Sequence, residues 1–231
     1  MDMQDLIDAN NRLEGAPPQA ILAWAWENLA PDVAATSSFQ TQSLPLLHMI
    51  AATTPDLPVY FLDTGFHFPE TLAFRDELMA RFGVRVITLQ PLMGHSGFKR
   101  QHGELYRTNP DLCCHLNKVE PWQQVKQGLR GWISGIRRDQ TEQRRDTPIL
   151  TRQSNGQIKV CPLATWGEAD VWRYIHRHDL PVHPLLSQGY LSIGCAPCTR
   201  PVTAGEDSRA GRWAGTAKTE CGLHLEPPTS S

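Results

Sequence analysis

The chain has 231 residues, of which 40% are hydrophobic and 20% charged, and its formal net charge at neutral pH is −2. This balance describes a globular protein without the positive field that a polyanion such as DNA needs, and no apolar run approaches the roughly 20 residues that cross a bilayer. The acidic start, MDMQDLIDAN, is unlike a secretory signal. We therefore expect no nucleic-acid or membrane partner and a cytoplasmic location, where six cysteines serve metals or redox chemistry more often than disulfides.

Helices and strands alternate along most of the chain, as hydrophobic spacing and the positions of proline and glycine indicate. In chain order, the pattern predicts helices over residues 3–13 and 21–29, a strand over 33–37, a helix over 44–52, a strand over 59–62, a helix over 69–82, strands over 85–89, 132–136 and 158–161, and a helix over 166–178. Such alternation implies right-handed crossovers and a mostly parallel sheet.

We predict an α/β fold with helices on both faces of this sheet, built as a single domain over residues 1–231. Residues 30–180 would form the core that contains the sheet. From about residue 181 the sequence becomes rich in glycine, proline and arginine and loses its periodicity. Residues 181–231 are therefore predicted to form a loop-rich, mobile C-terminal segment.

The loops that follow residues 37, 62 and 136 should share one crevice, because ligands of an open parallel sheet collect at the carboxyl ends of its strands. The first of these loops, SSFQTQS, offers hydroxyl and backbone N–H groups at a helix start, which suit phosphate or sulfate. A polar strand-to-helix turn is more often an ordinary connector, however. The loop also lacks the glycines and lysine of a Walker loop, and the chain has no dinucleotide fingerprint.

Four cysteines are arranged as two pairs, the tandem Cys113 and Cys114 and the pair Cys195 and Cys198 in GCAPC. Two pairs of thiolates can hold zinc or an iron–sulfur cluster. Zinc knuckles prefer a spacer of two to four residues, and adjacent side chains point in different directions on a regular backbone. The spacing therefore favours a cluster over zinc, with four unrelated buried thiols as the remaining alternative.

The other two cysteines differ in their surroundings. Cys161 ends a predicted strand without a cysteine near it in the sequence, and we expect it to be a buried apolar residue. Cys221 lies between Lys218 and His224, and positive neighbours stabilise a nucleophilic thiolate. An exposed terminal cysteine without a task explains the pattern of Cys221 equally well.

Arginines gather in two regions of the sequence. The regions contain Arg137, Arg138, Arg144 and Arg145, and then Arg200, Arg209 and Arg212. Guanidinium groups bind phosphate and sulfate in bidentate fashion, so both regions suit a small anionic ligand. Acidic residues are interspersed among them, and a salt-bridged surface is the alternative for any single arginine.

Taken together, these segments resemble the assimilatory adenylyl-sulfate (APS) and phosphoadenylyl-sulfate (PAPS) reductases that use thioredoxin. The matching motifs are SSF at 37–39, LDTG at 62–65, PET at 69–71, CC at 113–114 with Lys118, GIRRDQ at 135–140, PLATW at 162–166, GYLSIGCAPCTRPV at 189–202 and ECGLH at 220–224. The resemblance implies an adenine nucleotide alpha-hydrolase-like fold, with the nucleotide bound by residues 30–180. Because the four paired cysteines are present, it also implies a [4Fe-4S] cluster and APS as substrate.

The resemblance further assigns roles to individual residues. It implies catalysis by Cys221 and His224, cluster ligation by Cys113, Cys114, Cys195 and Cys198, and substrate binding by Ser38, Leu62, Lys118, Gly135, Arg145, Arg209 and Arg212. The sequence departs from the family pattern at two places. The residues before Arg144 and Arg145 are Thr-Glu-Gln, where relatives often have Ser-Pro-Gly, so either arginine could be the one that binds the substrate. Cys161 stands at a position that is often asparagine in relatives.

The reaction implied by the resemblance begins with attack of the Cys221 thiolate on the sulfate sulfur of APS, which expels AMP and leaves a Cys-S-sulfonate. Thioredoxin, or alternatively glutaredoxin, would then release sulfite. Three alternatives remain: a PAPS or dual APS/PAPS reductase, a non-catalytic iron–sulfur redox sensor or electron carrier, and an ATP-cleaving nucleotidyl enzyme, which the composition of SSFQTQS disfavours. The oligomeric state is left open.

Overall fold

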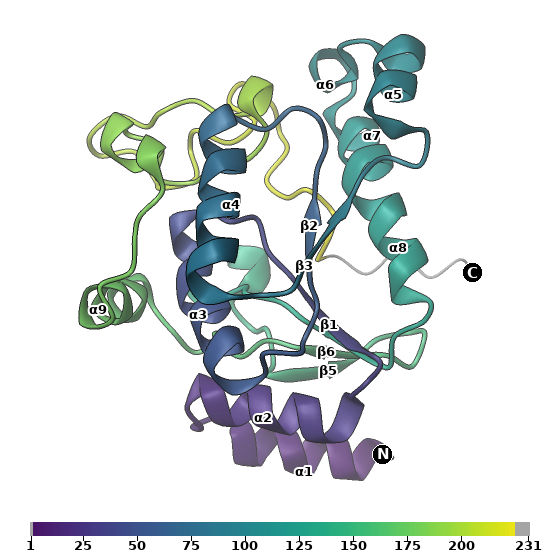
Figure 1. Ribbon diagram of the computed structural model, residues 1–231, viewed down its shortest axis with the longest axis vertical. Coiled ribbons are helices and arrows are strands. Elements are labelled where there is room, and N and C mark those ends of the chain that lie inside the picture. The colour runs from purple at the N-terminus through teal and green to yellow at the C-terminus, as the bar shows by residue number, and fades with distance from the viewer. Residues whose placement is uncertain (1, 225–231) are drawn as a thin grey trace.

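A six-stranded sheet forms the centre of the computed structural model, which describes residues 2–224 (Figure 1). Its strands are β1 (Val33–Thr36), β2 (Val59–Leu62), β3 (Val86–Leu89), β4 (Gly131–Ile133), β5 (Leu150–Arg152) and β6 (Ile158–Val160). The strand order is β3-β2-β1-β4-β6-β5, and every pairing is parallel except that of β5 with β6. The predicted mostly parallel α/β sheet is confirmed. The chain moves outward from β1 to β3 and then returns to β4 on the other side of β1, which makes the β1–β4 boundary the switch point where such sheets bind ligands.

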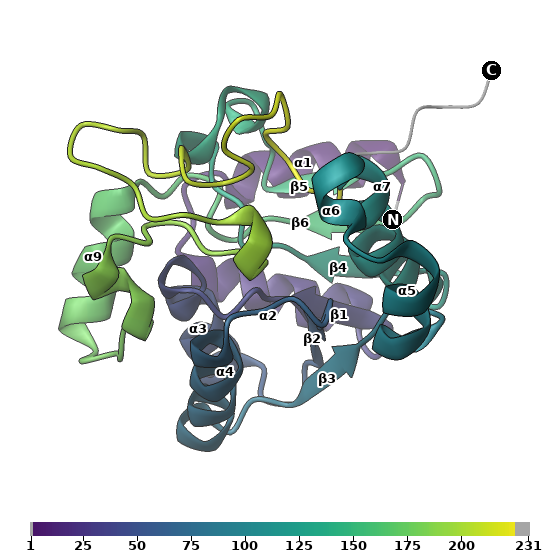
Figure 2. The same cartoon turned by 90° about the horizontal axis from the view of Figure 1, so that it is seen from above.

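Helices cover both faces of the sheet, as the two perpendicular views show (Figure 1, Figure 2). They are α1 (Met3–Leu13), α2 (Pro18–Leu29), α3 (Leu44–Thr53), α4 (Pro69–Phe82), α5 (Gly94–His102), α6 (Leu105–Thr108), α7 (Pro110–Cys114), α8 (Glu120–Lys126) and α9 (Glu168–Arg177). The predicted helices are present with small shifts at their ends. Four helices, α5 to α8, and the antiparallel edge strand β5 are additions that the sequence pattern did not predict. Across residues 2–224, no helix combines the length and the apolar composition needed to cross a bilayer.

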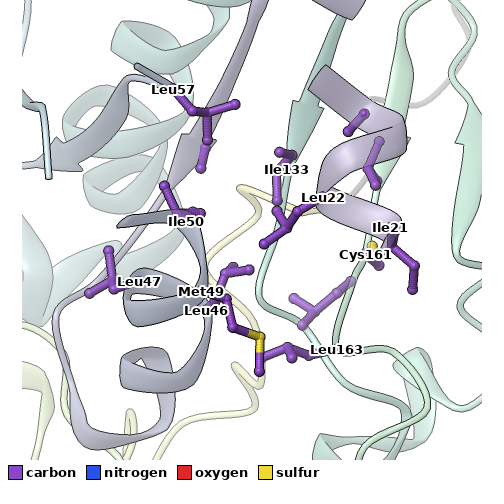
Figure 3. Close-up of a cluster of buried hydrophobic side chains, with 14 of the residues drawn as sticks. Ile21, Leu22, Leu46, Leu47, Met49, Ile50, Leu57, Ile133, Cys161 and Leu163 are labelled. Carbon is purple, nitrogen blue, oxygen red and sulfur yellow. The ribbon is translucent and has the colours of Figure 1, made fainter. Parts of the chain in front are cut away.

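Alternate residues of the strands supply two separate cores, because successive side chains point to opposite faces of a sheet. Val33 and Ala35 of β1 join the larger core, which α2, α3 and α9 cover. Figure 3 shows part of this core, including Cys161, whose thiol is fully buried as expected. Ala34 faces the smaller core on the other side of the sheet, with Trp122 of α8 against Trp132 of β4 at a ring-centre distance of 5.7 Å.

Between α9 and residue 224, the chain forms no strand and contains two short helical turns, Pro184–Gln188 and Ala196–Cys198. The predicted loop-rich character is confirmed over these residues. In Figure 1 this segment runs across the top of the molecule and then returns to the sheet. Leu223 packs against the smaller core. This return brings the end of the described chain to the carboxyl ends of the strands. The predicted tail continues to residue 231, and residues 225–231 lie outside the described residues.

Candidate functional site

A cavity lies at the carboxyl ends of the central strands and is called here the main cavity. Its wall combines the loops after β1, β2 and β4 with the returning C-terminal segment. The lining includes Ser38, Gln40, Leu62, His67, Lys118, Gly135, Gln140, Arg144, Arg209, Arg212, Cys221 and His224. The sheet topology therefore brings segments that are distant in the sequence to one place, as the crevice rule predicts.

The loop after β1 is shaped by a buried aromatic anchor. Phe39 has a positive φ of 54° and is fully buried, and its ring meets that of Phe61 edge-on at 5.6 Å. The Ser37 hydroxyl accepts the Phe39 N–H at 3.1 Å, and the hydroxyl oxygens of Ser38 and Ser43 lie 3.2 Å apart. Anchoring Phe39 under the loop leaves the small Ser38 on the wall of the main cavity.

The four paired cysteines line a second, smaller cavity, called here the cysteine cavity. Helix α7 ends at Cys113 and Cys114, and the turn Ala196–Cys198 places Cys195 and Cys198 opposite them. The Thr64 hydroxyl lies 3.2 Å from the Cys195 sulfur. Burial and the neighbouring sulfurs raise the pKa of Cys113 to about 12 and that of Cys198 to about 11. Ionising these thiols together therefore requires a compensating positive charge.

The described part of the chain contains no group of three or more His, Cys, Asp or Glu side chains that could hold a single metal ion. The four cysteine sulfurs nevertheless share one cavity. A zinc ion would need four sulfurs at about 2.3 Å from its centre. The thiols are free and form no disulfide with one another.

Lys118 connects the two cavities, since it lines both of them. It lies in a π-helical turn, His115–Val119, between α7 and α8, and such turns occur frequently at functional sites. Desolvation lowers the pKa of Lys118, but the sulfurs of Cys195, Cys114 and Cys221 outweigh it and hold the pKa above its ordinary value. The pKa shift therefore favours the charged ammonium form of Lys118 beside Cys221.

The end of the described chain is fixed on both sides of Cys221. Before it, the Glu220 carboxylate accepts a hydrogen bond from Arg144 at 2.6 Å. After it, the His224 ring stacks on Trp132 at 5.7 Å, with an angle of 11° between the ring planes. His224 Nδ1 lies 3.2 Å from the Ser134 hydroxyl. Desolvation, followed by the positive charge of Arg144, lowers the pKa of His224 well below its usual range, so the imidazole is neutral at neutral pH.

Adjacent arginines point to different places. Arg144 has a side chain that is 10% exposed and lines the main cavity, whereas the Arg145 side chain is 68% exposed and pairs with Glu142 at 2.5 Å. Arg145 is absent from the lining of the main cavity, so Arg144 is the member of this pair that lies on the cavity wall. Glu142–Arg144 forms a single 3-10 turn, which directs neighbouring side chains away from one another.

The other residues predicted for catalysis and substrate binding come together in one cavity. Ser38, Leu62, Lys118, Gly135, Arg209, Arg212, Cys221 and His224 all line the main cavity. The salt-bridged alternative applies to Arg138, which pairs with Glu14, and to Arg200, which pairs with Glu206 at 2.8 Å. Sequence reasoning missed His67, Trp132 and Glu220. Of these three, only Glu220 had a signal, its place beside Cys221.

Replacing Arg144 by alanine should weaken binding of APS, the substrate that the sequence resemblance implies, much more than the same change at Arg145. A guanidinium that reaches the cavity provides charge-assisted hydrogen bonds of about 1.5–3 kcal/mol, which corresponds to a roughly 10- to 100-fold rise in KM. Exposed pairs such as Arg145–Glu142 contribute about 0–1 kcal/mol. Steady-state kinetics of both variants provide the measurement, and an equal effect of the two substitutions would contradict the assignment of Arg144.

Comparison with known proteins identifies the family to which a chain with this site belongs. The model of the phosphoadenosine phosphosulfate reductase domain matches residues 32–201. The chain belongs to this family. It is 44% identical to an adenosine 5'-phosphosulfate reductase of Streptomyces coelicolor over 94% of this chain and 92% of the relative. It is 41% identical to a protein of the same name from Geobacillus kaustophilus over 94% and 93% of the two chains.

Solved structures show the same fold. The crystal structure of a PAPS reductase from Candida auris matches with a TM-score of 0.76 and 30% identity, covering 85% of this chain and 97% of that one. An FMN adenylyltransferase from Candida glabrata matches with a TM-score of 0.58 and 17% identity, covering 85% and 64% of the chains. The second likeness concerns the fold alone. Together they confirm the predicted nucleotide alpha-hydrolase-like architecture.

Proposed function

We propose that the protein is an oxidoreductase that converts APS to sulfite and AMP in assimilatory sulfate reduction, with thioredoxin or glutaredoxin as electron donor. Two lines of support meet here. The relatives named adenosine 5'-phosphosulfate reductase cover nearly the whole chain. The observation that carries the proposal is the position of Cys221 in the main cavity, together with Lys118, Arg209 and Arg212.

The main cavity offers separate surroundings for the two ends of such a substrate. Ser38, Leu62 and Gly135 lie at the carboxyl ends of three central strands and would bind the nucleoside. The arginine side chains that line the same cavity would bind the phosphosulfate, because their planar donors match phosphate and sulfate oxygens. This arrangement directs the sulfate end of APS towards Cys221.

The first step joins two negatively charged groups, which repel each other in the absence of positive charge. The Cys221 thiolate would attack the sulfate sulfur, the bond from that sulfur to the phosphate oxygen would break, and AMP would leave with the bonding electron pair. Lys118 offsets the repulsion, since its ammonium charge is maintained next to the Cys221 sulfur. The product on the protein is a Cys221 S-sulfonate.

The second step requires a dithiol protein. A thioredoxin thiolate would attack the Cys221 sulfur and release the sulfonate group as sulfite, forming a mixed disulfide. The second thioredoxin thiol would then attack this disulfide, freeing Cys221 and leaving oxidised thioredoxin. The two electrons that convert sulfate sulfur to sulfite therefore come from the dithiol.

We also propose that Cys113, Cys114, Cys195 and Cys198 hold a [4Fe-4S] cluster. The donors fit this group: the four thiols line one cavity, and iron–sulfur clusters are held by four cysteine thiolates. The raised pKa values of Cys113 and Cys198 indicate that a positive centre is needed for these two thiols to ionise. When bound, the cluster would supply that centre and tie the Gly194–Thr199 loop to α7.

A PAPS or dual-substrate reductase is the second candidate, favoured by the likeness to the Candida auris PAPS reductase. PAPS differs from APS by a 3'-phosphate, which needs additional space and positive charge. Turnover of both nucleotides by one preparation separates the candidates: an APS reductase should prefer APS by at least about tenfold in kcat/KM. The non-catalytic sensor predicts no turnover of either nucleotide.

The deciding experiment is mass spectrometry of the protein after incubation with APS and no reductant. The proposal predicts a sulfonate on the tryptic peptide that follows Lys218 and contains Cys221. Addition of thioredoxin should remove it and release an equal amount of sulfite. The Cys221→Ser variant is the control and should form no adduct. Sulfite production without any covalent intermediate on the protein would overturn this mechanism.

A further inference from the structure

Gly194, the residue before Cys195, lies against the guanidinium group of Arg212. A Cβ atom added at Gly194 would lie 2.6 Å from Arg212 Cζ and 2.8 Å from Arg212 Nε. Atoms in van der Waals contact are about 3.5–4.0 Å apart, so any side chain at this position would overlap the guanidinium. Gly194 does not have a positive φ, so its backbone conformation is open to other residues. The close approach of Arg212 is therefore the feature that requires glycine here.

Arg212 lies where the two cavities meet, and it lines both of them. Its Cζ is 4.4 Å from the centre of the Trp213 ring, which is a cation–π contact. Arg212 Nη1 donates to the Ile193 carbonyl at 3.2 Å, whereas Nε is buried and has no hydrogen-bond partner within the described chain. The position of the guanidinium therefore depends on packing against Gly194 and Trp213 more than on hydrogen bonds.

The segments that carry Gly194 and Arg212 are bonded to each other through their backbones. Thr199 and Arg212 form an antiparallel bridge, and the Trp213 N–H donates to the Cys198 carbonyl at 2.9 Å. The Gly194 N–H donates to the Thr199 hydroxyl at 3.2 Å. Because these bonds hold the backbone on both sides of the contact, a methyl group added at Gly194 should displace the guanidinium, the end of a flexible side chain.

The positive charge of Arg212 is not neutralised by the groups that hold it. The Ile193 carbonyl and the Ser192 hydroxyl, which lies 3.5 Å from Nη1, are both uncharged. Arg144, by contrast, pairs with the Glu220 carboxylate at 2.6 Å. A guanidinium binds phosphate or sulfate through a rigid, planar set of donors, so its orientation decides whether two bonds can form. The placement of Arg212 therefore affects anion binding directly.

We propose that Gly194 is a positioning residue that fixes the Arg212 guanidinium for binding an oxyanion in the main cavity. Because Gly194 has no side chain, the guanidinium can pack against the Gly194–Thr199 loop and the Trp213 ring while it lines this cavity. The inference rests on the proposed function for the identity of the oxyanion, the phosphosulfate of APS. In Gly194→Ala, Arg212 would keep its charge and lose its orientation.

A double-mutant cycle tests whether Gly194 acts through Arg212. Gly194→Ala, Arg212→Ala and the double variant are prepared with Cys221→Ser, so that APS binds without reacting and calorimetry gives its Kd. Each single substitution should raise this Kd by about 10- to 100-fold, the value of charge-assisted hydrogen bonds. The second substitution should then add less than about twofold. Effects that multiply in the double variant, or an unchanged Kd in Gly194→Ala, would overturn the proposal.

The matched control is Gly128→Ala, at a glycine where an added Cβ would meet only the Val125 carbonyl, at 3.9 Å. Its Kd should stay within about twofold of that of the parent protein. Because Gly194 precedes Cys195, the iron and sulfide contents of Gly194→Ala are measured as well and should equal those of the parent. Weak APS binding that accompanies a loss of iron would overturn the assignment to Arg212.

A crystal structure of Gly194→Ala tests the contact without any nucleotide. The Arg212 guanidinium should move by at least about 1 Å, the shortfall from a normal van der Waals distance, with the 194–199 backbone unchanged. A displaced loop beside an unmoved guanidinium would overturn the proposal. If Gly194→Ala does not fold, folding of the double variant supports the contact, and its failure to fold overturns it. If the parent protein does not bind APS, the proposed function fails, while the crystal structure still decides whether Gly194 positions Arg212.

Discussion

Replacement of Cys221 by serine should reduce thioredoxin-dependent sulfite formation from APS by at least about 1,000-fold, because removal of a nucleophile eliminates the covalent route. Serine preserves the shape of the side chain but supplies a hydroxyl that is hardly ionised at neutral pH. APS binding should persist, since the arginines of the main cavity remain. The measurement combines a sulfite assay with nucleotide binding by calorimetry.

Cys161 provides the matched control for this experiment. Its thiol is fully buried in the larger core, and burial raises its pKa to about 11, so it is neither accessible nor ionised. Cys161→Ala should keep the rate of sulfite formation within about twofold of the unmodified protein, while lowering the unfolding free energy by about 1 kcal/mol through the lost packing. A Cys221→Ser protein as active as Cys161→Ala would be incompatible with a sulfonated Cys221.

The central sheet could be predicted because its strands are short apolar runs separated by helices with clear ends. Pro69 and Gly83, for example, mark α4 at its first residue and just past its last. The helices between residues 94 and 126 were missed because their sequence is polar and their individual lengths are short. Strand β5 is only three residues long and pairs antiparallel at the edge of the sheet. The alternation of strands and helices that predicts parallel strands therefore gives no signal for it.

Site residues that belong to a sequence motif could be predicted, whereas residues that reach the site only through tertiary packing could not. Neighbours in the sequence such as Arg144 and Arg145 are equivalent in composition, and only the folded turn directs one into the cavity. The stacking of His224 on Trp132 joins the end of the described chain to β4 and leaves no trace in local sequence. Long-range contacts of this kind follow from the sheet order and from the path of the returning tail.

The charge of Lys118 should be the largest single electrostatic contribution to the sulfonation of Cys221. Lys118→Met preserves much of the side-chain volume and removes the charge, and we expect the single-turnover rate with saturating APS to fall by about 100- to 1,000-fold, the usual effect of losing one group that stabilises developing charge. Lys118→Arg should retain more of the rate than Lys118→Met. The control is Lys99→Met on α5, whose exposed side chain lies outside both cavities.

The pH dependence distinguishes the charge of Lys118 from a packing role. Because the folded protein raises the pKa of Lys118 above its ordinary value of 10.5, the stability linked to this group is complete below pH 10.5 and is lost only above it. Between pH 6 and pH 9, the unmodified protein should therefore stay faster than Lys118→Met in single turnover at every pH. Equal rates of the two proteins at the upper end of this range would mean that the ammonium charge is not maintained beside Cys221.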